Sequence, residues 1–230
     1  MTHQTNFGCG RTCARWQACR FMPVLRQVGH TAVFSHVSKV DVVIRDLDAL
    51  ETAGRKCGLV LHRGQKTYKW FGQSVGDYPI PTGMNVSDLG KCTHALSVAN
   101  NPDAYEIGVV AQADGTYNLV WDFWEGGYGL QERVGTDCED LIADYTIESA
   151  RNAARSVGWQ TIDVQDGTLL ILHPDRGTLT VHGNGTCEAN GFVGQGCHAT
   201  AIIENAIGTI RETNYKNEYY AQVAHVRQSE

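Results

Sequence analysis

The sequence lacks the features that mark several large classes of protein. No stretch approaches the roughly twenty consecutive apolar residues of a membrane-spanning helix, although 42% of the chain is hydrophobic. The N-terminus is polar and basic, and no apolar run of about seven residues follows it, as a secretory leader requires. We therefore predict a cytoplasmic protein with no membrane partner, in which the eight cysteines are reduced thiols.

Common nucleotide-binding and metalloprotease motifs are also absent. The chain has no G-x-x-x-x-G-K-[ST] loop, no G-x-G-x-x-G after an expected strand and no H-E-x-x-H pair. The first two motifs supply the backbone amides that hold phosphate groups. We therefore expect the chain to hydrolyse no nucleotide by itself, so that any ATPase involved is another polypeptide.

Positive charge is scarce outside the N-terminal segment. Four arginines and Lys39 precede the first acidic residue, Asp41, which gives +5 before that residue and −11 after it, within a net charge of −6. Because the body of the chain is acidic, we expect no broad nucleic-acid face. Residues 1–33 carry the arginines and three cysteines without clear periodicity, so we predict a basic, cysteine-containing N-terminal extension.

Short apolar segments interrupted by single helices predict an α+β fold. Helices are expected at 45–58, at 136–158 and in a short segment that ends before Gly208. Because strands and helices do not alternate strictly, we expect a mainly antiparallel sheet with two to three helices packed on it, followed by a small ββα unit. The strands are expected at 35–44, 59–62, 67–71, 93–98, 105–112, 116–124, 159–165, 167–173 and 177–183.

Capping residues set the ends of the predicted helices. Asp46 is the expected N-cap of the first helix, with Gly58 past its end, and Thr136 or Asp137 is the expected N-cap of the second. Apolar spacing predicts one buried stripe on the second helix. Its residues are Cys138, Leu141, Ile142, Tyr145, Ser149, Ala153 and Val157.

Several blocks of sequence resemble two families of unknown function. The blocks SHVSKVDVVIRDLDAL, YEIGVVAQADGTYNLVWDFW and SVGW resemble domain-of-unknown-function family 1257, which includes a plastid and cyanobacterial reading frame and similar phage proteins. The blocks LLILHPDRGTLTVHGNG, GFVGQGCHAT, ENAIG and NEYY resemble domain-of-unknown-function family 2997. The resemblance implies a 1257-like α+β domain at 34–165 and a 2997-like ββα unit at 166–225, after the extension at 1–33.

The resemblance also implies a partner. Genes of these families often lie beside genes for MoxR-like AAA+ ATPases, which implies an accessory role beside such a machine. We therefore interpret the chain as a non-catalytic binding or adaptor protein for a protein partner.

An aromatic and acidic segment, WDFWEGGYG, is the first candidate for the contact surface. We predict binding through Trp121, Trp124, Glu125 and Tyr128, because Trp and Tyr anchor protein interfaces. The alternatives are that the tryptophans belong to the core and that the acids are solvated or carry out acid–base chemistry. The glycine- and proline-rich loop 72–91 is the second candidate surface.

Two groups of cysteines suggest alternative functions. Cys197 and His198 follow a glycine-rich turn at the expected start of a helix, where the free N–H groups lower the pKa of a thiol. This position suits a thiol enzyme or redox protein, which we keep as the alternative, and we favour a small packed cysteine that lets the turn close. Cys9, Cys13 and Cys19 could bind zinc with a histidine as fourth ligand, but they lack paired C-x-x-C spacing.

Overall fold

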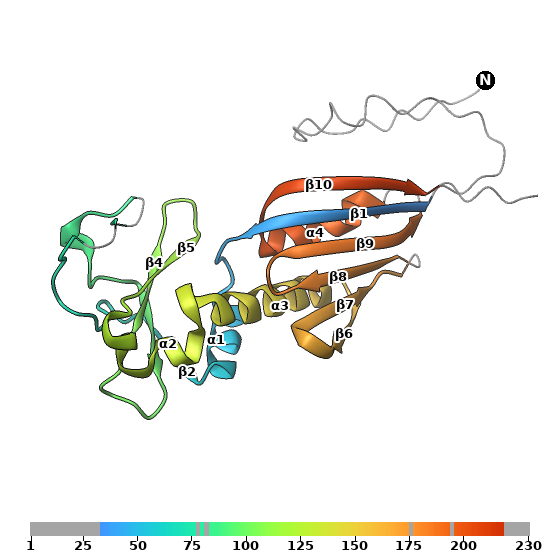
Figure 1. Cartoon of the computed structure of the whole chain (residues 1–230). Coiled ribbons are helices and arrows are strands. Elements are labelled where there is room, and N and C mark those ends of the chain that lie inside the picture. Colours follow the sequence, from blue (N-terminus) through green and yellow to red (C-terminus); the bar gives the residue numbers. More distant parts are fainter. Residues whose placement is uncertain (1–32, 77–78, 81–82, 175–176, 194–195, 219–230) are drawn as a thin grey trace, which may run out of the picture. The chain divides into compact units, whose positions relative to one another are not determined.

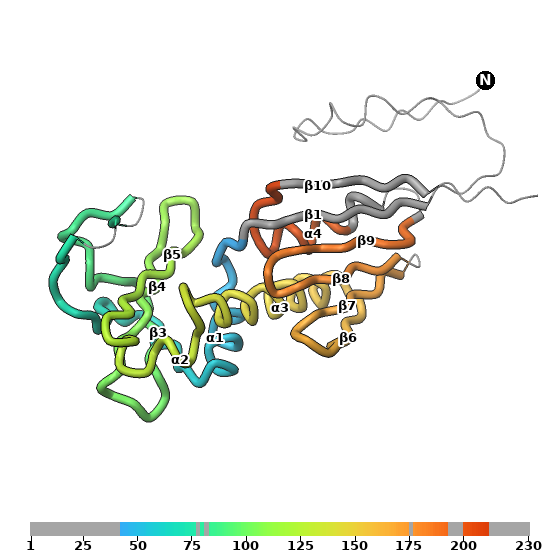
Figure 2. The backbone as a smooth tube through the Cα atoms, viewed as in Figure 1, coloured from blue at the N-terminus to red at the C-terminus, as the bar shows by residue number. Residues whose placement is uncertain are grey.

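The computed structural model describes residues 33–76, 79–80, 83–174, 177–193 and 196–218 (Figure 1). The chain divides into two units, Met1–His30 and Thr31–Glu230. All described residues belong to the second unit, whose backbone path is traced in Figure 2. The predicted extension at 1–33 lies almost entirely outside the described residues.

The described strands form two antiparallel sheets. The first has the order β2-β3-β4-β5 and the second has the order β10-β1-β9-β8-β7-β6. The predicted α+β fold with mainly antiparallel pairing is confirmed, with the strands divided between two sheets. The four-stranded sheet contains β2 (Leu59–Arg63), β3 (His94–Val98), β4 (Ile107–Ala111) and β5 (Tyr117–Val120). The six-stranded sheet contains β1 (Val33–Val42), β6 (Gln160–Val164), β7 (Thr168–Leu172), β8 (Thr178–His182), β9 (Thr186–Val193) and β10 (Gly208–Glu218).

The α-helices of the described chain are α1 (Leu47–Lys56), α2 (Gln131–Val134), α3 (Glu139–Ser156) and α4 (Gly196–Ile207). Asp46 caps α1 as predicted, because its Oδ1 accepts hydrogen bonds from the amides of Asp48 at 2.8 Å and Ala49 at 3.0 Å. The amide of Gly58, at φ +74°, follows the helix. None of the described helices is long and apolar enough to cross a membrane.

The start of α3 differs from the prediction. Thr136 and Asp137 do not cap this helix, because residues Thr136–Cys138 form a separate 3-10 turn. Cys138 occupies the N-cap position with a left-handed backbone, and its side chain makes no capping hydrogen bond. Acidic residues in the first turn, Glu139 and Asp140, face the positive end of the helix dipole instead.

Other differences concern the strands. The predicted strand at 67–71 is wrong: only Thr67 pairs, through an isolated bridge to Lys91, and Tyr68 is buried over the sheet. Sequence reasoning also missed β9 and β10, which add two strands to the predicted ββα unit. Strand β9 pairs with its sequence neighbour β8 on one side, and both β9 and β10 pair with β1. The pairing with β1 joins segments that are distant in sequence, so local patterns do not reveal it. This pairing crosses the boundary predicted between residues 165 and 166.

Helix α3 belongs to two hydrophobic cores. Cys138, Leu141 and Tyr145 pack in the core beneath the four-stranded sheet, together with α1. Ile147, Ala150 and Ala154 pack in the core of the six-stranded sheet, together with α4. The single predicted stripe therefore describes only part of the helix, and Val157 at its end is exposed.

Hydrogen bonds fix the segment that joins β1 to α1. The Tyr145 hydroxyl accepts from the amide of Arg45 at 2.8 Å and donates to the carbonyl of Val43 at 3.2 Å. The Ser149 hydroxyl donates to the carbonyl of Ala206 at 3.0 Å. Because both side chains come from α3, this helix ties the crossing segment and the end of α4 together.

Candidate functional site: an exposed aromatic turn

The segment after β5 forms an unusual left-handed turn. Five consecutive residues have positive φ: Glu125 at 51°, Gly126 at 67°, Gly127 at 58°, Tyr128 at 52° and Gly129 at 100°. A left-handed backbone costs a non-glycine residue roughly 1–2 kcal/mol, so the three glycines reduce the total strain. Gly127 is also buried, and a Cβ there would lie 3.1 Å from the carbonyl oxygen of Asp122.

Hydrogen bonds from neighbouring segments hold this turn in place. The Asp122 carboxylate accepts from the amides of Trp124 at 2.8 Å and Phe71 at 3.1 Å. The carbonyl of Gly127 accepts from the amide of Tyr105 at 2.9 Å. The Asn101 amide group donates to the carbonyl of Tyr128 at 3.0 Å. The turn is therefore fixed at both ends by groups outside it.

The turn presents aromatic rings to solvent. Trp124 is 48% exposed and Tyr128 is 43% exposed, and their ring centroids lie 6.2 Å apart. Phe71 packs against Trp124 at 5.0 Å, and Tyr105 packs edge-on against Tyr128 at 5.2 Å. We use the name aromatic surface for Phe71, Trp124, Glu125 and Tyr128.

The charge on the aromatic surface is negative. Glu125 is exposed, and desolvation together with a hydrogen bond to its carboxylate raises the pKa of Tyr128. Desolvation and the nearby charges of Asp122 and Glu125 also raise the pKa of Tyr105. Both phenols therefore stay protonated at neutral pH and can donate hydrogen bonds.

Three of the four predicted contact residues come together here. Trp124, Glu125 and Tyr128 lie on the turn, whereas Trp121 is partly buried and packs against the core of the four-stranded sheet. The ring of Trp121 lies 6.1 Å from that of Phe123. Sequence reasoning missed Phe71, which reaches the surface from another segment. Its hydrogen bond to Asp122 is non-local, so no sequence signal indicates it.

The second candidate surface, loop 72–91, lies next to a segment that covers the four-stranded sheet. The rings of Tyr68 and Trp70 and the side chain of Met84 form a small cluster over Ala95 and Val120. Residues 72–76 read Gly-Gln-Ser-Val-Gly, a G-x-S-x-G pattern that is typical of a hydrolase nucleophile when it lies on a tight strand-to-helix turn. Here it lies in an exposed loop, so it does not form such a turn.

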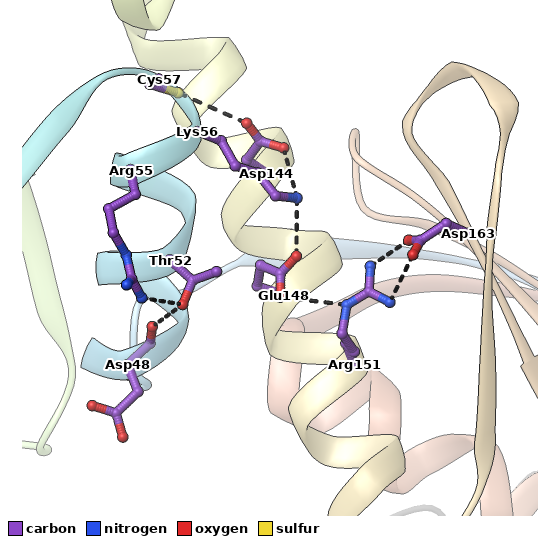
Figure 3. A network of polar contacts seen from close by, with 9 residues as sticks. All are labelled: Asp48, Thr52, Arg55, Lys56, Cys57, Asp144, Glu148, Arg151 and Asp163. Atoms are coloured by element: carbon purple, nitrogen blue, oxygen red, sulfur yellow. Dashed lines mark hydrogen bonds and ion pairs between the residues drawn. The ribbon is translucent and has the colours of Figure 1, made fainter.

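A network of charges connects α1, α3 and β6 (Figure 3). The Lys56 amino group lies 2.9 Å from the Glu148 carboxylate, whose other oxygen lies 3.3 Å from the Arg151 guanidinium. Arg151 also makes two hydrogen bonds to Asp163. Glu148 and Arg151 are both buried. Sequence reasoning missed this pair, because charges three residues apart on a helix ordinarily indicate a solvated face.

The network shifts the pKa of its members. The hydrogen bonds from Arg151 lower the pKa of Asp163. Burial lowers the pKa of Lys56, but the Glu148 and Asp144 carboxylates together outweigh it, and the pKa is raised overall. Lys56 is therefore protonated and Asp163 ionised at neutral pH, and the network joins groups next to both cores.

The candidate thiol site lies at the start of α4. Gly196 is the first residue of this helix, so the backbone of Cys197 and His198 lies in its first turn, as predicted. Two other histidines have partners of their own: His173 packs against Trp159 at 4.6 Å, and the Nε2 of His182 lies 3.4 Å from the Glu188 carboxylate.

Three described thiols outside α4, those of Cys57, Cys92 and Cys138, are poor nucleophiles. Burial raises the pKa of Cys57 and of Cys92 to about 11, and burial also raises the pKa of Cys138. Because the thiolate is the reactive form, these side chains are packing residues at neutral pH.

No group of three or more His, Cys, Asp or Glu residues in the described part of the chain could hold a metal ion. The predicted zinc ligands Cys9, Cys13 and Cys19 lie outside the described residues. Zinc binding by these three cysteines therefore stays a prediction.

Comparison with known proteins finds one family. No curated protein and no solved structure matches the chain. A family model described as "Protein of unknown function (DUF2997)" matches residues 180–220, which include the end of β8 and all of β9, α4 and β10. The tail of the chain, within the predicted unit at 166–225, is thus similar to this family of unknown function.

Proposed function

We propose that the chain is a non-catalytic adaptor that binds a protein partner through the aromatic surface. The observation that carries the proposal is the exposure of Trp124 and Tyr128, each close to half exposed, on a turn that is fixed by hydrogen bonds. Trp and Tyr are the residues most enriched among those that dominate the affinity of protein interfaces.

The fixed backbone of the turn supports binding energetically. Association costs free energy when side chains and loops become ordered. Asp122 and Asn101 already hold the turn in the free protein, so less of that cost remains on binding. The Glu125 carboxylate favours a partner that offers a basic group beside an apolar pocket.

The proposed partner is a MoxR-like AAA+ ATPase. Two considerations support it: the resemblance of the chain to families whose genes accompany such ATPases, and the lack of a phosphate-binding loop in the chain itself. In this proposal the ATPase supplies the hydrolysis, and the chain supplies a contact surface.

Calorimetry with the purified ATPase tests the proposal. The full chain is titrated against the ATPase as wild type and as the double variant W124A/Y128A. Loss of two anchors costs about 2 kcal/mol or more, which weakens binding by about 30-fold or more. The matched control is Ile202→Ala on α4, where the isoleucine is 44% exposed. This variant leaves binding unchanged. Equal affinities for wild type and double variant would overturn the proposed surface, and no binding by wild type would overturn the proposed partner.

A second candidate function is thiol chemistry at Cys197. The observation that favours it is the start of α4 at Gly196, which places the Cys197 backbone among the free amides of a helix N-terminus. Alkylation by iodoacetamide across a pH series tests it. A Cys197 that reacts at neutral pH, with an apparent pKa well below about 8.5, supports the function; a rate equal to that of the buried Cys138 rejects it.

A further inference from the structure

The two faces of the six-stranded sheet differ in their covering. Helices α3 and α4 pack on one face, and the inward residues of β7, β8 and β9 lie in the core between them. No element of the described chain packs on the other face. Most outward residues of β8 and β9 are polar, which suits a solvated sheet face. They are Thr178, Thr180, His182, Thr186, Glu188 and Asn190, and Thr168 of β7 lies on the same face.

The exposed apolar side chains of this open face gather at one edge. Ile162 is 47% exposed and Val164 is 46% exposed, and both lie on β6. Ile162 pairs in register with Leu170 of β7, so these two side chains point to the same face. Leu172, two residues further along β7, lies on that face as well. The patch therefore covers the outermost two strands.

Strand β6 is also an edge that lacks the usual protection. It is the last strand in the sheet order, so one side of its backbone has no strand partner in the described chain. Edge strands are ordinarily protected by charged side chains, especially lysine, by proline, by a bulge or by an inward-pointing charge. The segment QTIDV has no lysine and no proline, and its register with β7 is regular. Its one charged residue, Asp163, points to the helix-covered face, but its charge is neutralised by Arg151.

We propose that β6 pairs antiparallel with β6 of a second copy of this chain, so that the two six-stranded sheets become continuous. A second copy fits because the strand is centred on Ile162. In the symmetric register Ile162 lies opposite Ile162 of the other copy, and Gln160 lies opposite Val164. The outward residues Leu170 and Ile162 of both copies then form one apolar stripe.

Charge favours the same register. Asp163 lies opposite Thr161 of the other copy, so no like charges meet directly, and Arg151 neutralises each Asp163 carboxylate from within its own chain. The whole chain carries a net charge of −6, so two copies repel each other in general. At β6 the acidic side chain is paired, and two copies approach there without repulsion between unpaired acids. A five-residue strand buries a limited area, so we expect a reversible dimer in the micromolar range.

Sedimentation velocity of the full chain over a concentration series tests the dimer. We expect the mass to rise from one chain to two, and we expect Ile162→Lys to return it to one chain at every concentration. The matched control is Val60→Lys on β2, where the valine is 43% exposed, and this variant keeps the dimer. A wild type that stays a monomer, or a dimer that Ile162→Lys leaves intact, would overturn the proposal.

Cross-linking tests the register. Opposite residues in an antiparallel pair have Cα atoms about 4.5–5.5 Å apart, within the Cα–Cα range of a disulfide. Oxidised Ile162→Cys therefore forms a covalent dimer, whereas Val60→Cys and wild type do not. If wild type forms a dimer but Ile162→Cys does not cross-link and the β6 amides gain no protection from hydrogen exchange, the dimer packs through another surface. That outcome would contradict strand pairing.

Discussion

The two sheets of this protein are covered differently. The four-stranded sheet is packed on both faces, by α1 on one side and by the cluster of Tyr68, Trp70 and Met84 on the other. The six-stranded sheet is packed on one face only, by α3 and α4. The half with the four-stranded sheet, which irregular segments cover, therefore displays side chains on turns. The half with the six-stranded sheet displays an open sheet face and a strand edge.

The two halves also share a helix. Helix α3 contributes its first turns to one core and its later turns to the other, so neither core is complete without it. The comparison thus predicts that the two halves present different surfaces but unfold together.

The largest expected effects are on the cores. Leu96→Ala in the four-stranded half and Leu179→Ala in the six-stranded half each remove a fully buried side chain and lower the free energy of unfolding by about 2–5 kcal/mol. Because α3 is shared, each variant shifts the unfolding of both sheets. Hydrogen exchange of β3 and β8 at increasing urea concentration measures this. Loss of protection in one sheet alone would show that the halves are independent.

Arg151→Leu comes next. This variant leaves the buried Glu148 carboxylate paired with Lys56, and breaking a buried ion pair costs about 3–5 kcal/mol. Partial compensation by Lys56 places the expected loss at the lower end, near 3 kcal/mol. Urea unfolding at neutral pH measures it. The control Arg155→Leu, an exposed residue on the same helix, should change stability by less than about 0.5 kcal/mol.

Gly108→Ala tests the covering of the four-stranded sheet. The ring of Tyr68 lies directly over Gly108, where an added Cβ would overlap it. The overlap lowers the free energy of unfolding by about 1–3 kcal/mol. In the background of Tyr68→Ala the same change costs much less, and this double-mutant cycle is the measurement. An equal cost in both backgrounds would mean that the ring does not pack on the sheet.

Asp163→Asn gives the smallest effect and a pH signature. The hydrogen bonds from Arg151 hold the folded pKa of Asp163 below its ordinary value of 3.8. The ion pair therefore contributes stability above pH 3.8, and this contribution is lost as the pH falls through the folded pKa. Because Asp163 is mostly exposed, wild type and variant should differ by less than about 1 kcal/mol at pH 7. The urea midpoints of wild type and variant should converge as the pH falls. A difference between them that stays constant with pH would exclude the ion pair as its cause.

Local sequence signals predicted the elements that local interactions define. Asp46 and Gly58 marked the ends of α1 because a cap and a left-handed glycine act within one turn of helix. The short apolar segment at 93–98 predicted β3 for a similar reason. The start of α4 followed from the glycines before it.

The features that sequence reasoning missed depend on distant contacts. The partner of β1 comes from β9 and β10, and the burial of Glu148 and Arg151 depends on Lys56 and Asp163. The left-handed turn at Glu125–Tyr128 is recorded in the sequence only as two adjacent glycines. Its exposure depends on Phe71 and Asn101, which come from other segments.

Co-purification from the native host tests the central claim most directly. The full chain is tagged and recovered as wild type and as W124A/Y128A, with Ile202→Ala as the control, and the retained proteins are identified by mass spectrometry. The account predicts an AAA+ ATPase that is retained by wild type and by the control and is lost from W124A/Y128A. The same proteins retained by all three forms would contradict a partner surface at Trp124 and Tyr128.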